Sequence, residues 1–228
     1  MDLALNALSG RPRRFDLIAF DWDGTLYDST AAIVRSIQAA VADVGGTPPS
    51  DEQAAFVIGM SLVPALAHAA PDVPAERHAA LANRYRYHFL QHQDDISLFP
   101  GVLDLLHALR ERGHILAVAT GKSRRGLDLA LRDPQLHGLF DGSRTADETA
   151  GKPDPLMLDE LMAEFGVEPD KTLMVGDTTH DLQMAVNARC PGLGVAYGAH
   201  APESFARYEP LFVAQSVAQL RGWLLENA

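Results

Sequence analysis

Short apolar runs alternate along this chain with longer stretches of helical periodicity. The run FDLIAF at residues 15–20 precedes a turn residue, Gly24, and predicts a buried strand. The intervening stretches repeat apolar residues every three or four positions, as at Val102, Leu105, Leu106 and Leu109, and predict helices. Further strands are predicted at residues 114–119, 143–146, 172–175, 193–196 and 211–213. This alternation predicts an α/β fold with a doubly wound, Rossmann-like parallel sheet.

One long segment departs from the alternation. Residues 29–97 contain helical patterns that glycine and proline interrupt, and no convincing strand. The segment begins at good helix caps near Ser29 and ends before the sequence Phe99-Pro100-Gly101. We therefore predict a core domain at residues 1–28 and 98–228, with an all-helical cap domain inserted at residues 29–97.

Composition narrows the classes of partner. The 228 residues carry a formal net charge of −11, which argues against nucleic acid or an anionic membrane as the main partner. No apolar run approaches the roughly 20 residues that a membrane-spanning helix needs. An anionic substrate would therefore have to be attracted locally, by a metal ion or by a few placed cations.

The termini and the cysteine content indicate a compartment. The single cysteine, Cys190, excludes an internal disulfide, favours a reducing cytoplasm, and is interpreted as structural. Residues 1–14 place their arginines after short apolar pieces, which is the wrong order for a secretory signal, so a frayed leader is expected. We expect a cytoplasmic monomer or homodimer.

Two acidic residues follow the first predicted strand. If the strand continued, Asp21 and Asp23 would point to the same side, and their charges would repel unless a cation relieved them. A hard cation such as Mg²⁺ suits the position, since it prefers oxygen ligands and is often held by one or two carboxylates. A surface Asp-x-Asp-Gly turn is the alternative interpretation of the same residues.

Other polar residues follow the later strands. Thr120 ends the second strand, Lys152 lies in a later loop, and Asp177 ends the strand at residues 172–175, with Asp181 one helical turn further on. Active sites of such sheets lie outside the carboxyl ends of the strands, so these groups should converge on one crevice. Taken singly, Thr120 could be a strand-end hydroxyl, Lys152 a solvated lysine and Asp181 a helix cap.

The converging groups suit phosphoryl transfer. A carboxylate can attack phosphorus, and a second carboxyl group can serve as acid and then base. A hydroxyl and a lysine can hold the phosphoryl oxygens, and Mg²⁺ can offset the repulsion between carboxylates and phosphate.

The order of these groups resembles a known family. Asp21-Trp22-Asp23-Gly24-Thr25, Thr120, Lys152 and Gly176-Asp177-x-x-x-Asp181 look like the four ordered motifs of the haloacid dehalogenase superfamily. The resemblance covers residues 15 to about 198. The insert resembles the cap of the branch that contains phosphoglycolate phosphatase and β-phosphoglucomutase, and local runs such as VATGKS at residues 118–123 look most like the phosphoglycolate-phosphatase-like members.

The resemblance implies a role for each residue. Asp21 would be the nucleophile and a metal ligand, and Asp23 the general acid and base, binding Mg²⁺ through its backbone carbonyl. Thr120 and the amide of Gly121 would hold phosphate. The remaining roles are that Lys152 would bridge nucleophile and phosphate, Asp177 would bind Mg²⁺ directly, and Asp181 would bind it through water or orient its neighbours.

Several functions stay open at this level. The expected activity is hydrolysis of a small-molecule phosphate monoester, with phosphoglycolate as one candidate. A phosphomutase of the β-phosphoglucomutase type and a non-catalytic binding scaffold are the alternatives. A carboxylated substrate would need a cation from the cap, and the sequence does not say which of its four arginines faces the crevice: Arg35, Arg77, Arg84 or Arg86.

Overall fold

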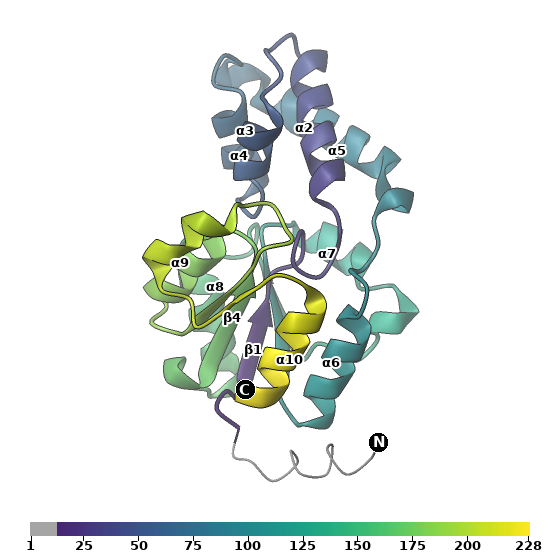
Figure 1. Ribbon diagram of the computed structural model, residues 1–228. Helices are drawn as coiled ribbons and strands as arrows, with labels where there is room; N and C mark the ends of the chain where they lie inside the picture. Colours follow the sequence, from purple (N-terminus) through teal and green to yellow (C-terminus); the bar gives the residue numbers. More distant parts are fainter. Residues whose placement is uncertain (1–12) are drawn as a thin grey trace.

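Six parallel strands form the centre of the molecule. The computed structural model describes residues 13–228, so the leader predicted at the N-terminus lies, for residues 1–12, outside the described part (Figure 1). Every neighbouring pair in the sheet is parallel, which confirms the predicted fold class. The spatial order is β3-β2-β1-β4-β5-β6. The strands are β1 (Leu17–Phe20), β2 (Ile115–Thr120), β3 (Gly142–Thr145), β4 (Thr172–Gly176), β5 (Gly192–Val195) and β6 (Val213–Ala214).

Helices cover both faces of this sheet. Because successive strand residues point to opposite faces, Ile18 and Phe20 pack on one side of β1, and Leu17 and Ala19 on the other. The first face is covered by α6 (Val102–Glu111), α7 (Arg124–Ala130) and α10 (Val217–Asn227), and the second by α8 (Leu156–Phe165) and α9 (Thr179–Asn187). A fully buried side chain such as Leu105 contributes roughly 1.5–3 kcal/mol relative to an exposed one.

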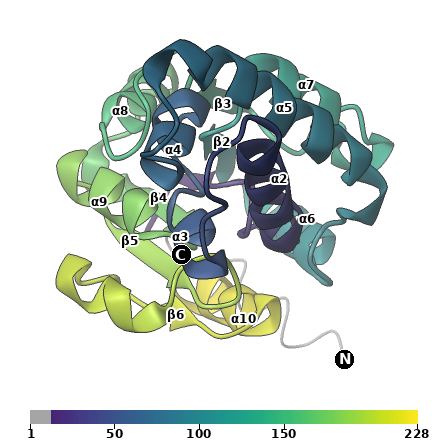
Figure 2. The same ribbon diagram turned by 90° about the horizontal axis from the view of Figure 1, so that it is seen from above.

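A group of four helices stands above the carboxyl end of β1 (Figure 1), and Figure 2 shows the same group from above. They are α2 (Thr30–Asp43), α3 (Asp51–Phe56), α4 (Leu62–Ala69) and α5 (His78–Gln91). Their apolar faces enclose a hydrophobic cluster of their own, which includes Ile37, Val41, Leu66 and Leu81. We therefore propose that the chain is divided as predicted from the sequence, into a core domain and a helical cap domain at residues 29–97.

Two chain segments join the helical group to the sheet, and they lie side by side. The amide of Asp28 donates to the carbonyl of Ser97 at 2.9 Å, and Tyr27 forms an isolated antiparallel bridge with Leu98. Shorter 3-10 helices complete the connections: η1 (Ala75–Arg77), η2 (Gln93–Asp95), η3 (Pro134–Leu136), η4 (Pro169–Lys171) and η5 (Pro202–Tyr208).

The observed strands differ from the predicted ones by a residue or two at their ends, and most at the sheet edge. A strand was predicted at residues 211–213, whereas β6 spans Val213–Ala214, the residues that pair with Gly194 and Val195. None of the helices in the described part of the chain has the length and apolar character needed to cross a membrane.

Candidate active site

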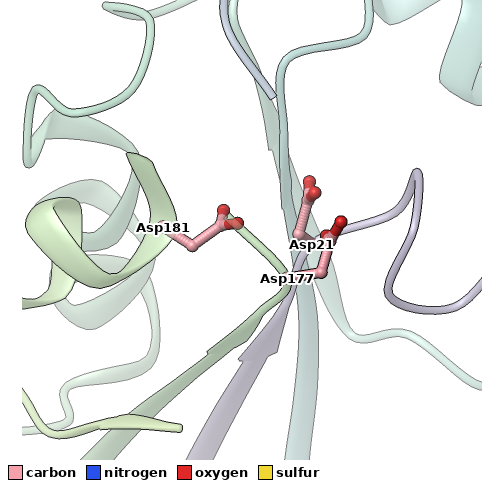
Figure 3. Close-up of side chains that lie close together, drawn as sticks. All are labelled: Asp21, Asp177 and Asp181. Atoms are coloured by element: carbon pink, nitrogen blue, oxygen red, sulfur yellow. The ribbon is translucent and has the colours of Figure 1, made fainter. Parts of the chain in front are cut away.

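Three buried carboxylates meet at the carboxyl edge of the sheet. Asp21 follows β1, Asp177 follows β4, and Asp181 lies in the first turn of α9. One carboxylate oxygen from each lies within 4.8 Å of the others, and each residue is at most 1% exposed. Figure 3 shows the Asp181 side chain pointing from its helix toward the other two.

Lys152 supplies a positive charge inside this cluster. Its Nζ donates to Asp21 Oδ1 at 2.6 Å and forms an ion pair with Asp181 Oδ1, also at 2.6 Å. Burial lowers the pKa of the lysine, but the Asp181 and Asp21 carboxylates raise it by a larger amount. The net shift of the pKa is therefore upward, and Lys152 stays protonated. The loop before α8 thus brings Lys152 into contact with Asp21 and Asp181.

Asp181 has two functions at once. Its Oδ2 accepts from the Thr178 amide at 3.0 Å and the Thr178 hydroxyl at 2.7 Å, which completes a capping box at the start of α9. Its Oδ1 faces Lys152. The capping and site interpretations of Asp181 are therefore compatible, because each uses a different oxygen.

Asp177 is held by groups that sequence reasoning did not identify. The Thr25 hydroxyl donates to its Oδ1 at 2.7 Å, and the Ala199 amide donates to its Oδ2 at 2.7 Å. Thr25 closes the Asp21-Trp22-Asp23-Gly24-Thr25 motif, so its place in the motif was a usable signal. Ala199 lies in a loop with no such pattern.

The charges in the cluster do not balance. When all four groups are ionised, three carboxylates and the Lys152 ammonium leave a formal charge of −2. Burial and the Asp181 carboxylate raise the pKa of Asp177 to about 7, although hydrogen bonds from Ala199 and Thr25 oppose this shift. Burial likewise raises the pKa of Asp21, together with the charges of Asp181 and Asp177, while Lys152 lowers it.

These residues fit a divalent cation. Among the described residues, Asp21 Oδ2 is buried without a hydrogen-bond partner. Such an atom costs about 1–3 kcal/mol unless something binds it, and the oxygen-only donor set with its surplus of two negative charges matches a hard dication.

Asp23 does not join the cluster. β1 ends at Phe20, so the strand alternation that would align Asp23 with Asp21 does not continue. Instead, Lys122 Nζ donates to both Asp23 oxygens at 2.9 and 2.7 Å, and the Ser29 hydroxyl donates to Oδ1 at 2.7 Å. The expected repulsion between the two acids is thus relieved on the Asp23 side by a lysine that the sequence analysis had not singled out. Its position two residues after Thr120 was the available signal.

A cavity of about 800 Å³ connects these groups to the cap. Its core side includes Asp21, Asp23, Thr120, Gly121 and Lys122. The Thr120 oxygen accepts from the Lys122 amide at 3.2 Å, and the hydroxyl proton has no acceptor among the described residues. The predicted residues of the first two motifs therefore share one cavity, while Asp177, Asp181 and Lys152 contact Asp21 or its neighbours without lining that cavity.

The cap is seated directly on this edge of the core. The Phe56 carbonyl at the end of α3 accepts from His180 Nε2 at 2.8 Å and from His200 Nε2 at 3.0 Å. The Thr179 amide donates to His200 Nδ1, which assigns the ring proton to Nε2. His180 thus borders the site as a cap contact.

Several other cysteine, aromatic and histidine residues lie outside the three-aspartate cluster. Burial raises the pKa of the Cys190 thiol to about 12, which agrees with a structural cysteine. Trp22 is 1% exposed and stacks on Tyr27 with ring centroids 4.9 Å apart, as expected of a packing residue. His88 and His92 pair with Asp43 and Asp95, respectively, away from the three-aspartate cluster.

Comparison with known proteins places this geometry in a family. The Haloacid dehalogenase-like hydrolase family matches residues 18–195. The chain is 34% identical to "Probable phosphatase IndB" of Dickeya dadantii, over 90% of this chain and 92% of that protein. It is 33% identical to a phosphoglycolate phosphatase of Vibrio vulnificus, over 93% and 97% of the two chains.

Solved structures agree with the sequence relatives. A hydrolase from Pseudomonas syringae is 25% identical and superimposes with a TM-score of 0.84, covering 92% of this chain and 98% of that one. A predicted phosphoglycolate phosphatase from Haemophilus somnus, also 25% identical, gives a TM-score of 0.80 over 92% and 98% of the two chains. This chain therefore belongs to the haloacid dehalogenase-like hydrolase family and is an enzyme of its phosphatase type.

Proposed function

We propose that this phosphatase hydrolyses a small-molecule phosphate monoester through a phosphorylated Asp21, with Mg²⁺ as cofactor. One observation carries the proposal: Asp21 lines the cavity, and its Oδ2 is buried without a partner among the described residues while Lys152 holds Oδ1. A carboxylate that Lys152 holds in a fixed orientation at the cavity is placed for attack on a bound phosphoryl group.

The metal site would use the carboxylates of Asp21, Asp177 and Asp181, together with the main-chain carbonyl of Asp23. When bound, Mg²⁺ supplies the positive charge that lets an anionic phosphate approach an anionic nucleophile. Burial raises the pKa of Asp21, so a cation in the cluster would also favour the ionised, nucleophilic form.

The chain's own residues divide the two half-reactions. In the first, Asp21 forms a bond to phosphorus, the ester P–O bond breaks, and the Asp23 carboxyl gives its proton to the departing alkoxide. In the second, Asp23 takes a proton from the water that attacks phosphorus, and the bond from Asp21 to phosphorus breaks to release inorganic phosphate. The free Thr120 hydroxyl proton, the Gly121 amide and the Lys152 ammonium would hold the phosphoryl oxygens.

Phosphoglycolate is a candidate substrate. Several relatives at 30–33% identity bear the name phosphoglycolate phosphatase. Of the four cap arginines, Arg86 alone is among the residues that line the cavity, and Arg125 of the core lines it as well. Either guanidinium could meet a carboxylate at the far end of such a substrate.

Replacement of the nucleophile tests the proposal. Asp21→Asn keeps the shape of the side chain but removes the attacking charge, so release of phosphate from para-nitrophenyl phosphate with Mg²⁺ should fall by about 10³-fold or more. The exposed Asp104 offers a matched control, and Asp104→Asn should leave the rate unchanged.

Three outcomes would decide between the functions. Near-normal turnover by Asp21→Asn would contradict the aspartyl-phosphate pathway. Phosphate release slower than substrate loss would favour a phosphomutase. Failure of the unaltered protein to cleave any ester of a broad panel, with Mg²⁺ present, would favour a binding scaffold.

A further inference from the structure

The cavity above Asp21 has a predominantly apolar wall. Besides the polar residues of the core, its lining includes Ile37, Met60, Leu62, Phe89, Leu90 and Leu129. A volume of about 800 Å³ lies within the range of roughly 300–1,000 Å³ typical of sites that bury organic ligands with substantial apolar surface. A small, doubly anionic acid would leave most of this wall in contact with water.

The cavity is present while the cap rests on the core. The Phe56 carbonyl is bonded to both His180 and His200, and Lys122 Nζ lies 4.9 Å above the Phe89 ring. A Cβ atom added to Gly121 would come within 2.5 Å of the Gly59 carbonyl oxygen, so these two backbone segments already touch. The cavity is therefore not a gap left by a cap that has moved away from the core, because the cap contacts the core around it.

Three large apolar side chains reach solvent at this cavity. Val63, Leu90 and Leu129 are 48%, 53% and 42% exposed, and they come from α4, α5 and α7, respectively. A single exposed leucine needs no explanation, but apolar residues from three helices that meet at one cavity form a coherent surface. A ligand that covers them would remove that surface from water.

We propose that the substrate of this site carries an apolar organic group, such as a long alkyl chain or an aromatic ring, on its phosphate. The inference rests on the proposed phosphatase function and names its substrate class. The phosphate would lie at Asp21 and Thr120, and the apolar group would extend under the cap along Phe89 and Leu90 to Leu129. Arg86 and Arg125 also line the cavity, so the apolar group could carry one additional anionic or polar substituent that binds a guanidinium.

A series of alkyl phosphates tests the apolar wall. Ethyl, butyl and hexyl phosphate share a leaving-group chemistry and differ in the apolar area that they can bury. Each methylene buried contributes about 0.8 kcal/mol, or roughly fourfold in affinity, so kcat/KM should rise by at least tenfold from ethyl to hexyl phosphate. Hexyl phosphate should also exceed phosphoglycolate in kcat/KM.

Variants at exposed wall positions show where the preference originates. Leu90→Gln and Leu129→Gln place an amide on the proposed path and should each reduce the hexyl-to-ethyl ratio of kcat/KM by roughly threefold or more. Leu156→Gln is the matched control, because Leu156 is 39% exposed on α8, is absent from the cavity lining, and should leave the ratio unchanged. The exposure of all three leucines favours retention of the fold, which melting curves would verify.

Binding without turnover supplies an independent measurement. Calorimetry on Asp21→Asn should show hexylphosphonate binding at least tenfold more tightly than ethylphosphonate. Equal rates along the series, or a clear preference for phosphoglycolate, would overturn the inference and leave the phosphatase assignment intact. Absence of phosphate release from every ester would instead count against the proposed function, and calorimetry would still report on the apolar wall.

Discussion

Lys122 contacts both an acidic residue of the core and an aromatic residue of the cap. Its ammonium contacts both Asp23 oxygens and lies 4.9 Å above the Phe89 ring, with only 15% of the lysine side chain exposed. Asp23 is proposed to give a proton to the leaving group, so its orientation matters most when the leaving group is a strong base. We therefore expect Lys122 to act as a positioning residue, through Asp23.

This role predicts an effect that depends on the ester. Lys122→Met should lower kcat/KM for an alkyl phosphate by about ten- to a hundredfold, a part of the 10²–10⁴ that acid–base catalysis typically contributes. The loss for para-nitrophenyl phosphate should be much smaller, because its leaving group departs without a proton. Steady-state kinetics on the two esters measures the difference.

Lys171 provides the control for this variant. It is exposed and lies in η4, and Lys171→Met should leave both rates unchanged. Equal losses on the two esters with Lys122→Met would indicate a general structural effect and would contradict positioning through Asp23.

At the scale of elements, the cap touches the core through backbone as well as side chains. The stretch at residues 59–60, between α3 and α4, lies against Gly121, which follows β2. The nearest atoms to a Cβ on Gly121 would be the carbonyl oxygens of Gly59 at 2.5 Å and Met60 at 2.7 Å. Because backbone atoms cannot rotate away as a side chain can, the glycine allows this close approach.

Gly121→Ala should therefore displace the cap. The core should keep its fold, while kcat/KM falls by roughly a hundredfold, as expected when reacting groups are misplaced by about 1 Å. Fluorescence melting would report core stability, and kinetics with hexyl phosphate would report the loss of cap contacts.

Gly222 is the matched control, since a Cβ there has nothing within 4 Å and the residue lies in α10. Gly222→Ala should leave the rate unchanged and stabilise the helix by roughly 0.5–1 kcal/mol. A Gly121→Ala enzyme with unaltered kinetics would show that the cap does not need this approach.

At the scale of the whole molecule, the site concentrates negative charge within a protein that is acidic throughout. When all four groups are ionised, the buried cluster accounts for −2 of the chain's formal net charge of −11. The stability of the folded protein should therefore depend on which species offsets the repulsion between the three carboxylates: a proton at low pH or Mg²⁺ at neutral pH.

In the metal-free protein, the Asp177 carboxyl group should contribute more to stability as the pH falls from about 8 to about 6. Asp177 has a folded pKa of about 7 against an ordinary value near 3.8, so in this range the folded protein binds a proton that the unfolded chain does not. His180 and His200 oppose this contribution in the same pH range, because burial lowers their pKa values and the unfolded chain then binds protons that the folded protein does not.

Thermal unfolding in a chelator, repeated with Mg²⁺, measures this dependence. Mg²⁺ at about a hundred times its Kd should add about 2.7 kcal/mol at pH 8, with a smaller gain at pH 6. The stability difference between the unaltered protein and Asp177→Asn isolates the Asp177 contribution and should shift in favour of the unaltered protein as the pH falls from 8 to 6. Asp177→Asn should also lose much of the Mg²⁺ effect. A melting temperature independent of Mg²⁺ at pH 8 would contradict a metal site at these aspartates.

Local patterns in the chain were sufficient for the architecture and for part of the site. Apolar runs separated by stretches of helical periodicity predicted the strands and helices of the parallel sheet fold, because strand and helix patterns both depend on residues near one another in sequence. Asp21, Thr120 and Asp177 could be assigned to one edge because the carboxyl ends of parallel strands share that edge. Lys152 lies in an irregular loop and was expected at the same crevice, but its role as the bridge between nucleophile and phosphate came only from the family resemblance.

Contacts between distant segments needed the folded molecule. Lys122 pairs with Asp23 across 99 residues, and the Phe56 carbonyl meets His180 and His200 across 124 and 144 residues. Such contacts follow from how the cap packs on the core, which no local periodicity encodes. The apolar wall beneath the cap has the same origin. From the sequence, the leucines of α5 and α7 can be identified only as helix residues, and it is the packing of the cap on the core that brings them to one cavity.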